Sequence, residues 1–203
     1  MRTVVDSVCA VSNQPQNIEA LNADLHALRT RYPGATIERY LDKIPEIAAD
    51  VYLAPTSVVV GSVVLGEQVS IWHGVVIRGD VNRVEIRNRS NIQDGSVVHL
   101  GDLDPTFVDE DVVVGHRAVL HGCHIEAGCL IGIQSTVLDG VIVGEGSVVG
   151  AGAIVTSGTR IPPRSLVLGI PGKVVKKLTE EDEAFHRKLA AKYVRLAHNY
   201  LHG

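Results

Sequence analysis

An aliphatic residue recurs at every sixth position over most of this sequence from Leu53 to Val167, and this period restricts the folds open to the chain. The spacing is interrupted by an insertion near Asn82–Arg83, by extra residues within Leu100–Phe107 and by one residue fewer after Leu120. Generic buried strands of a sandwich would not hold a six-residue phase through so many units. A structural repeat of fixed length is therefore expected. The aliphatic positions are Leu53, Val59, Leu65, Ile71, Ile77, Ile86, Ile92, Val98, Val108, Val114, Leu120, Ile125, Ile131, Val137, Val143, Val149, Val155, Ile161 and Val167.

Three six-residue units, each a short strand followed by a tight turn, make one triangular coil of about eighteen residues. The aliphatic residue points into the prism, and a small or β-branched residue four positions later, such as Ser96 or Ala118, packs beside it. Stacked coils hydrogen bond at a spacing of about 4.8 Å and bury a continuous aliphatic column. We therefore predict an all-β parallel β-helix rather than the strands of a sandwich.

Both ends of the chain depart from this period. Thr179 and Asp182 have the spacing of a capping box, and apolar residues at helical spacing follow, which predicts an amphipathic helix outside the prism. A short helix is expected over residues 18–28, ended by Tyr32-Pro33-Gly34. We divide the chain into an N-terminal extension (1–45), a β-helix domain (46–173) and a C-terminal helix (174–203).

Composition excludes several classes of function. The net charge of −4 argues against a nucleic-acid or anionic-membrane partner, and no apolar run approaches the roughly 20 residues of a membrane span. The first residues make a poor signal peptide, and three cysteines, Cys9, Cys123 and Cys129, fit a reducing compartment. The sequence predicts a cytoplasmic protein that binds neither nucleic acid nor membrane.

The repeat relates three of the nine histidines to one another. His99 follows Val98 and His121 follows Leu120, and these aliphatic positions are three strands, or one coil, apart. The two imidazoles are expected to stack about 5 Å apart on one outward face and to converge on one metal ion. His116 lies near a corner on the preceding face, so a neighbouring copy about a three-fold axis would complete the site.

Outward-facing histidines are also ordinary surface residues. His73 lacks a stacked partner, and His124 is expected at a turn in the shortened six-residue unit. Cys123 is expected to pack rather than bind metal. Three imidazoles with an open fourth position are typical of catalytic Zn²⁺, although Fe²⁺ and Co²⁺ accept the same ligands.

Three segments of the sequence resemble the γ-class carbonic anhydrases. They are Ile77–Asn82 together with Asn91–His99, and Gly115–Cys123. The likeness covers roughly residues 45–175 and is closest to the short carbonic-anhydrase-like branch of these hexapeptide-repeat proteins. It implies a left-handed β-helix, a homotrimer, and reversible hydration of CO₂ to bicarbonate by a metal-bound hydroxide.

The resemblance also implies a role for individual residues. His99 and His121 match two metal ligands of one subunit, and His116 matches the ligand supplied by its neighbour. Arg78 and Asp80 match an ion pair that helps to hold the trimer together.

Three further polar residues match the surroundings of the family's metal. Asp94 matches a carboxylate near the ion pair, and Gln93 matches a residue that hydrogen bonds the metal-bound water. Asn91 matches a polar residue that lines the site. Asn91 and Asp94 are equally well explained as residues that satisfy turn backbone groups.

The sequence departs from the family's prototype in its acidic residues. Val81 stands where the prototype has Glu, and the loop Leu100–Phe107 is short, with Asp102 and Asp104 as its only carboxylates. These departures predict slow proton export and low activity, with Asp102 and Asp104 as the only carboxylates of the loop that could replace the relay.

Two alternatives stay open. A hexapeptide-repeat acyltransferase that uses a CoA thioester would share the β-helix and the segment Gly169–Lys173, but it needs only one histidine base. A non-catalytic metal-binding assembly protein would share the three histidines without turnover.

Overall fold

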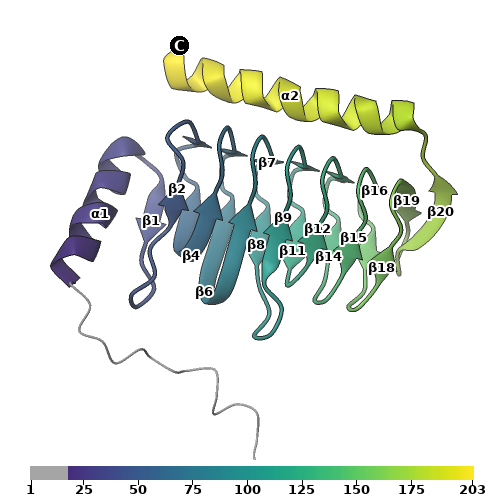
Figure 1. Ribbon diagram of the computed structural model, residues 1–203, viewed down its shortest axis with the longest axis horizontal. Coiled ribbons are helices and arrows are strands. Elements are labelled where there is room, and N and C mark those ends of the chain that lie inside the picture. Colours follow the sequence, from purple (N-terminus) through teal and green to yellow (C-terminus); the bar gives the residue numbers. More distant parts are fainter. Residues whose placement is uncertain (1–17) are drawn as a thin grey trace, which may run out of the picture.

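The computed structural model describes residues 18–203, which form a parallel β-solenoid with a helix from each end of the sequence packed on it (Figure 1). The predictions for residues 1–17, including those on Cys9 and the signal peptide, lie outside the described residues. The helices are α1 (Ile18–Arg31) and α2 (Glu180–His202). The longer strands are β4 (Val58–Leu65), β6 (Val76–Ile86), β19 (Ser165–Leu168) and β20 (Lys173–Lys177).

The other strands are only two or three residues long, as the six-residue unit requires. They are β1 (Thr36–Glu38), β2 (Glu46–Ile47), β3 (Tyr52–Leu53), β5 (Ser70–Ile71), β7 (Asn91–Ile92), β8 (Val97–His99), β9 (Thr106–Val108), β10 (Val113–Val114), β11 (Val119–His121), β12 (His124–Ile125), β13 (Leu130–Ile131), β14 (Thr136–Val137), β15 (Ile142–Val143), β16 (Val148–Val149), β17 (Ile154–Val155) and β18 (Arg160–Ile161).

Parallel pairing between successive coils builds the faces of the prism. One sheet has the order β17-β14-β11-β8-β6-β9-β12-β15-β18, and β4 joins β1 and β2 to β6. It covers two faces, because the long strand β6 pairs with β8 through its first residues and with β9 through its last. The third face is the sheet β20-β19-β16-β13-β10-β7-β5-β3.

The aliphatic residues of the six-residue units form the core. From Val59 to Val155 each of them is at most 1% exposed. Burial of one Val, Leu or Ile side chain contributes about 1.5–3 kcal/mol, so the column is the main apolar source of stability. The predicted parallel β-helix is confirmed. Strand pairing reaches back to Thr36, where β1 pairs with β4, and the division of the chain at residues 45 and 173 stays a prediction.

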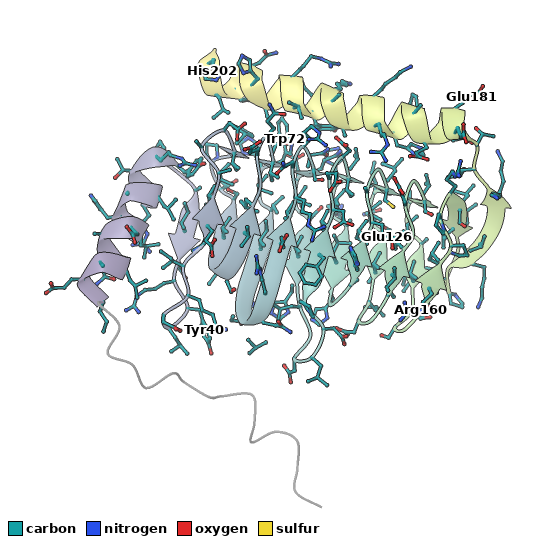
Figure 2. All side chains as sticks on the ribbon, viewed as in Figure 1. Tyr40, Trp72, Glu126, Arg160, Glu181 and His202 are labelled. Carbon is teal, nitrogen blue, oxygen red and sulfur yellow. The ribbon has the colours of Figure 1, made fainter. Side chains whose placement is uncertain are left out.

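Helix α2 lies along the outside of the solenoid, against β3, β5, β7 and β10 (Figure 1). It starts with a complete capping box: the Asp182 amide donates to Thr179 Oγ1 at 3.2 Å, and the Thr179 amide donates to the Asp182 carboxylate at 2.9 Å. Trp72 lies beneath the helix (Figure 2), with its ring 5.7 Å from that of Tyr193 and 5.5 Å from that of Tyr200. These aromatic contacts fix the helix over the third face.

Neither of the two helices in residues 18–203 has the length and apolar character needed to span a bilayer.

The buried His186 makes the packing of α2 sensitive to acid. His186 is 6% exposed, and its Nδ1 has no hydrogen-bond partner among the described residues. Burial lowers the pKa of this imidazole, although Asp182 and Glu183 act in the opposite direction. The neutral ring is therefore the form that the folded protein favours.

We expect the free energy of unfolding to fall as the pH drops below about 6.5, because the unfolded chain then binds a proton that the folded chain excludes. The contribution of one histidine is at most about 1.4 kcal/mol per pH unit. His186→Leu removes this proton uptake, so urea denaturation at about pH 7.5 and about pH 5.5 should show a smaller acid loss for the variant. Equal losses in both proteins would contradict the expectation.

Candidate metal centre

The parallel ladder places His99 and His121 side by side. Strands β8 and β11 pair in a register that sets His121 opposite His99, which is the relation that the six-residue count predicts. Residues at the same position of neighbouring parallel strands point to the same side of a sheet. The two ring centroids are accordingly 5.1 Å apart, and both rings are partly buried.

Each ring of this pair has one nitrogen occupied by an aspartate. His99 Nε2 lies 3.2 Å from Asp80 Oδ1, and His121 Nδ1 lies 2.7 Å from Asp139 Oδ1. A carboxylate accepts hydrogen bonds, so each of these nitrogens carries the ring proton in a neutral imidazole. The remaining nitrogens, His99 Nδ1 and His121 Nε2, therefore both present lone pairs.

These two remaining nitrogens face each other at 3.1 Å. Two nitrogen ligands at about 2.0–2.1 Å from a tetrahedral metal are roughly 3.3 Å apart. Two facing lone pairs repel each other. A cation bound between them would accept both lone pairs as ligands and remove this repulsion. The donor set and its spacing fit a divalent metal ion.

The electrostatics of His99 favour the neutral, metal-binding form of the ring. Burial lowers the pKa of His99, nearby Arg78 and His121 lower it further, and Asp80 opposes them. Burial alone would raise the pKa of Asp80, but hydrogen bonds from the Val81 amide, His99 and Arg78 outweigh it and lower that pKa overall. Asp80 is thus held as the carboxylate that orients His99.

Arg78 and Asp80 form an ion pair within one chain, since both project from β6. Arg78 is about half exposed, so the pair by itself contributes little to the stability of one subunit. Its predicted role between subunits stays a prediction.

His116 lies apart from the stacked pair, in the turn that joins β10 on the third face to β11 on the next. Arg117 beside it has a φ of 59°, so the chain bends sharply here. The hydrogen bond of His116 Nδ1 is to Asp94 Oδ2 at 2.9 Å, which leaves Nε2 for another partner. Within residues 18–203 of one chain, no three His, Cys, Asp or Glu side chains form a group that could hold a metal.

Gln93 and Asn91 lie on the same side of the molecule as His116. Gln93 Nε2 donates to Asn91 Oδ1 at 3.1 Å, and both side chains are buried. Gln93 and His116 line an open groove of about 430 Å³ between the third face and α2, together with Ile133, Leu189 and Tyr193. The structure therefore separates the predicted residues into a half-site on His99 and His121 and a second half-site on His116 and Gln93.

Two residues near these half-sites had no assigned role in the sequence. The sequence places Tyr193 only on the apolar side of a helix, but in the structure its phenol hydrogen bonds Gln93. Burial raises the pKa of the Tyr193 phenol, Asp94 raises it further, and the hydrogen bond with Gln93 lowers it. Asp139 contacts His121 from the following coil. The only sequence pattern that could have identified Asp139 as a site residue is the pair Asp139–Gly140 in the turn one coil after His121. Aspartates are too common in turns for this pattern to be specific.

Residues 122–157 match a family described as "Bacterial transferase hexapeptide (six repeats)". A probable carbonic anhydrase of Methanocaldococcus jannaschii is 48% identical over 151 residues, which is 74% of this chain and 95% of that protein. The mitochondrial gamma carbonic anhydrase 2 of Arabidopsis thaliana is 40% identical over 80% of this chain. This chain spans only about 60% of the length of that relative and of its paralogue, gamma carbonic anhydrase 1.

A solved structure from Bacillus cereus, described as a putative acetyltransferase, is 40% identical with a TM-score of 0.81. It covers 83% of this chain, and the match spans 98% of that protein. The stacked six-residue units and this likeness define a protein of the hexapeptide-repeat class with a parallel β-helix fold. Within that class, the chain belongs to the γ-class carbonic anhydrase-like family.

We expect His99→Ala and His121→Ala each to abolish stable metal binding, because each removes one of the two facing nitrogens. Metal analysis after gel filtration should find about one Zn²⁺ per chain in the unaltered protein and almost none in either variant. His124→Ala is the matched control, since His124 also contacts an aspartate, Asp109, at 3.0 Å but has no stacked imidazole. Full metal content in the two site variants would disprove the assignment.

Proposed function

We propose that this chain forms a homotrimer that binds a divalent metal at each subunit interface and catalyses the reversible hydration of CO₂ to bicarbonate. The observation that carries the proposal concerns three imidazoles. His99, His116 and His121 each contact an aspartate through one ring nitrogen, which leaves the other ring nitrogen to bind a metal. Relatives named as carbonic anhydrases support the same activity.

The need for a second subunit follows from the separation of the half-sites. His99 and His121 face one side of the prism, while His116 lies at the corner beside the groove under α2. A three-fold axis brings the corner of one prism against the face of the next, so each interface receives all three imidazoles. In this arrangement Gln93 arrives with His116, because the two line one groove.

A divalent cation held by three neutral imidazoles supplies Lewis acidity and lowers the pKa of water to about 7. Gln93 is suited to orient the reacting water. Its amide nitrogen is committed to Asn91, and Tyr193 also contacts this amide, so its carbonyl oxygen can accept a hydrogen bond from water at the interface. Formation of the C–O bond of bicarbonate then requires one proton to leave the site.

Proton departure is expected to depend on buffer. Val81 is apolar and partly exposed beside Asp80, where the family's prototype carries a glutamate. Asp102 and Asp104 lie in the loop that follows β8 and are the nearest acidic residues along the chain after His99. We propose an enzyme of low rate in which an external buffer accepts the proton.

The metal is proposed to be Zn²⁺, while Fe²⁺ and Co²⁺ remain compatible with three imidazoles. The proposed location is the cytoplasm. Cys123 and Cys129 are free thiols, and burial raises the pKa of each to about 12, so both stay protonated and unreactive.

Acyl transfer from a CoA thioester is the second candidate, and the Bacillus cereus structure described as a putative acetyltransferase favours it. That activity does not need the facing nitrogens of His99 and His121. A metal-binding assembly without turnover is the third candidate.

Loading with Zn²⁺, or with Fe²⁺ under anaerobic conditions, should produce CO₂ hydration above the uncatalysed rate. Stopped-flow measurement with a pH indicator should show a rate that increases with buffer concentration, because the chain lacks the glutamate relay. A parallel assay of thiol release from acetyl-CoA should stay at background. Full metal occupancy with background hydration would disprove the proposed reaction, and thiol release would favour acyl transfer.

Co-expression of His99→Ala with His116→Ala tests the shared site. Sedimentation should show a trimer of about 65 kDa, three times 21.7 kDa, for all proteins. Each variant alone should lack activity and metal. Mixed trimers should recover about one quarter of the sites, because only interfaces with the intact His99 of one chain and the intact His116 of another are complete. No recovery in verified mixed trimers would contradict a site shared between subunits.

A further inference from the structure

Asp139 is an aspartate that the fold brings to the candidate metal centre from the neighbouring coil. It follows β14 (Thr136–Val137), which pairs with β11 one coil earlier, so it approaches His121 from the neighbouring coil. Its Oδ1 lies 2.7 Å from His121 Nδ1, the shortest of the aspartate contacts made by His99, His116 and His121.

Two glycines make room for this carboxylate. A Cβ added at either Gly101 or Gly122 would overlap Asp139 Oδ1. Gly122 also has a φ of 56°, which favours glycine, but Gly101 has no such backbone requirement. A side chain at Gly101 would therefore displace the Asp139 carboxylate from its present position.

We propose that Asp139 is a positioning residue that sets which nitrogen of His121 binds the metal. A neutral imidazole has one proton, and the nitrogen that donates to a carboxylate keeps it. Asp139 thereby holds the proton on Nδ1 and leaves the lone pair on Nε2, the atom that faces His99 Nδ1 at 3.1 Å. The carboxylate also makes the ring a more basic ligand. This inference rests on the proposed metal site.

The pair of His124 and Asp109 shows what is specific to Asp139. His124 Nε2 lies 3.0 Å from Asp109 Oδ2, so a histidine on an aspartate also occurs away from the centre. The ring of His124 contacts Phe107 edge-on at 5.9 Å rather than a second imidazole. The aspartate contact thus has a consequence for metal binding only where the opposite nitrogen meets another ligand.

The test compares Zn²⁺ dissociation constants, measured by competition with a chelating dye, for the unaltered trimer and three variants. Asp139→Ala should bind Zn²⁺ about 10- to 100-fold more weakly. Asp139→Asn should lie between, because its amide oxygen can accept the same proton without a charge. Gly101→Ala retains the carboxylate but displaces it, and it should weaken binding in the same direction as Asp139→Ala.

Asp109→Ala is the matched control and should change the Zn²⁺ affinity less than about two-fold, since it disturbs a His–Asp pair without a facing ligand. Unchanged affinity in Asp139→Ala, or an equal loss in Asp109→Ala, would overturn the inference. Folding is checked by sedimentation, and Gly101→Ala keeps the test decisive if Asp139→Ala fails to assemble.

A second measurement separates this inference from the proposed function. In the metal-free protein, ¹⁵N chemical shifts should show the His121 proton on Nδ1, and Asp139→Ala should move population to the Nε2 form. If the proton stays on His121 Nδ1 but the protein binds no Zn²⁺, the metal site is refuted, while the contact by which Asp139 orients His121 is supported. A His121 tautomer that Asp139→Ala does not change would refute the positioning role even if CO₂ hydration is observed.

Discussion

The in-register backbone ladder between successive coils is the constraint on which the rest of this structure depends. Each coil returns the chain to the same face with the same side-chain orientation, so residues one coil apart are held at the strand spacing of about 4.8 Å. This distance suits two imidazoles that share one ion. The pairing of His99 with His121 therefore requires no loop and no strained backbone, because the ladder that buries the aliphatic core also aligns the two rings.

The same regularity explains how much of the molecule could be predicted from its sequence. Counting the six-residue units, with an insertion in β6 and a longer loop after β8, reproduces the observed register of β8 with β11. The capping box at Thr179 was equally visible, because it depends on residues three positions apart. These features are local or periodic, so both can be predicted from the spacing of residues along the chain.

The unpredicted parts depend on contacts that have no fixed spacing. The approach of Asp139 to His121 is set by the course of a turn and by the space left at Gly101 and Gly122. The contact of Tyr193 with Gln93 depends on where α2 docks across the third face, which the aromatic cluster around Trp72 determines. Neither the period nor the capping pattern contains that information. The family resemblance indicated Gln93 but not the partners that orient it.

In the proposed trimer, the placement of two imidazoles on one half-site and the third on another would couple metal binding to assembly. Two neutral imidazoles on one subunit form an incomplete ligand set, whereas a completed interface adds His116 already oriented by Asp94. A ligand that binds only the assembled state stabilises that state by mass action. The metal would then strengthen the trimer that creates its own site. The aspartate contacts of the three rings would fix each ring before that assembly, so less side-chain freedom would be lost when the third ligand arrives.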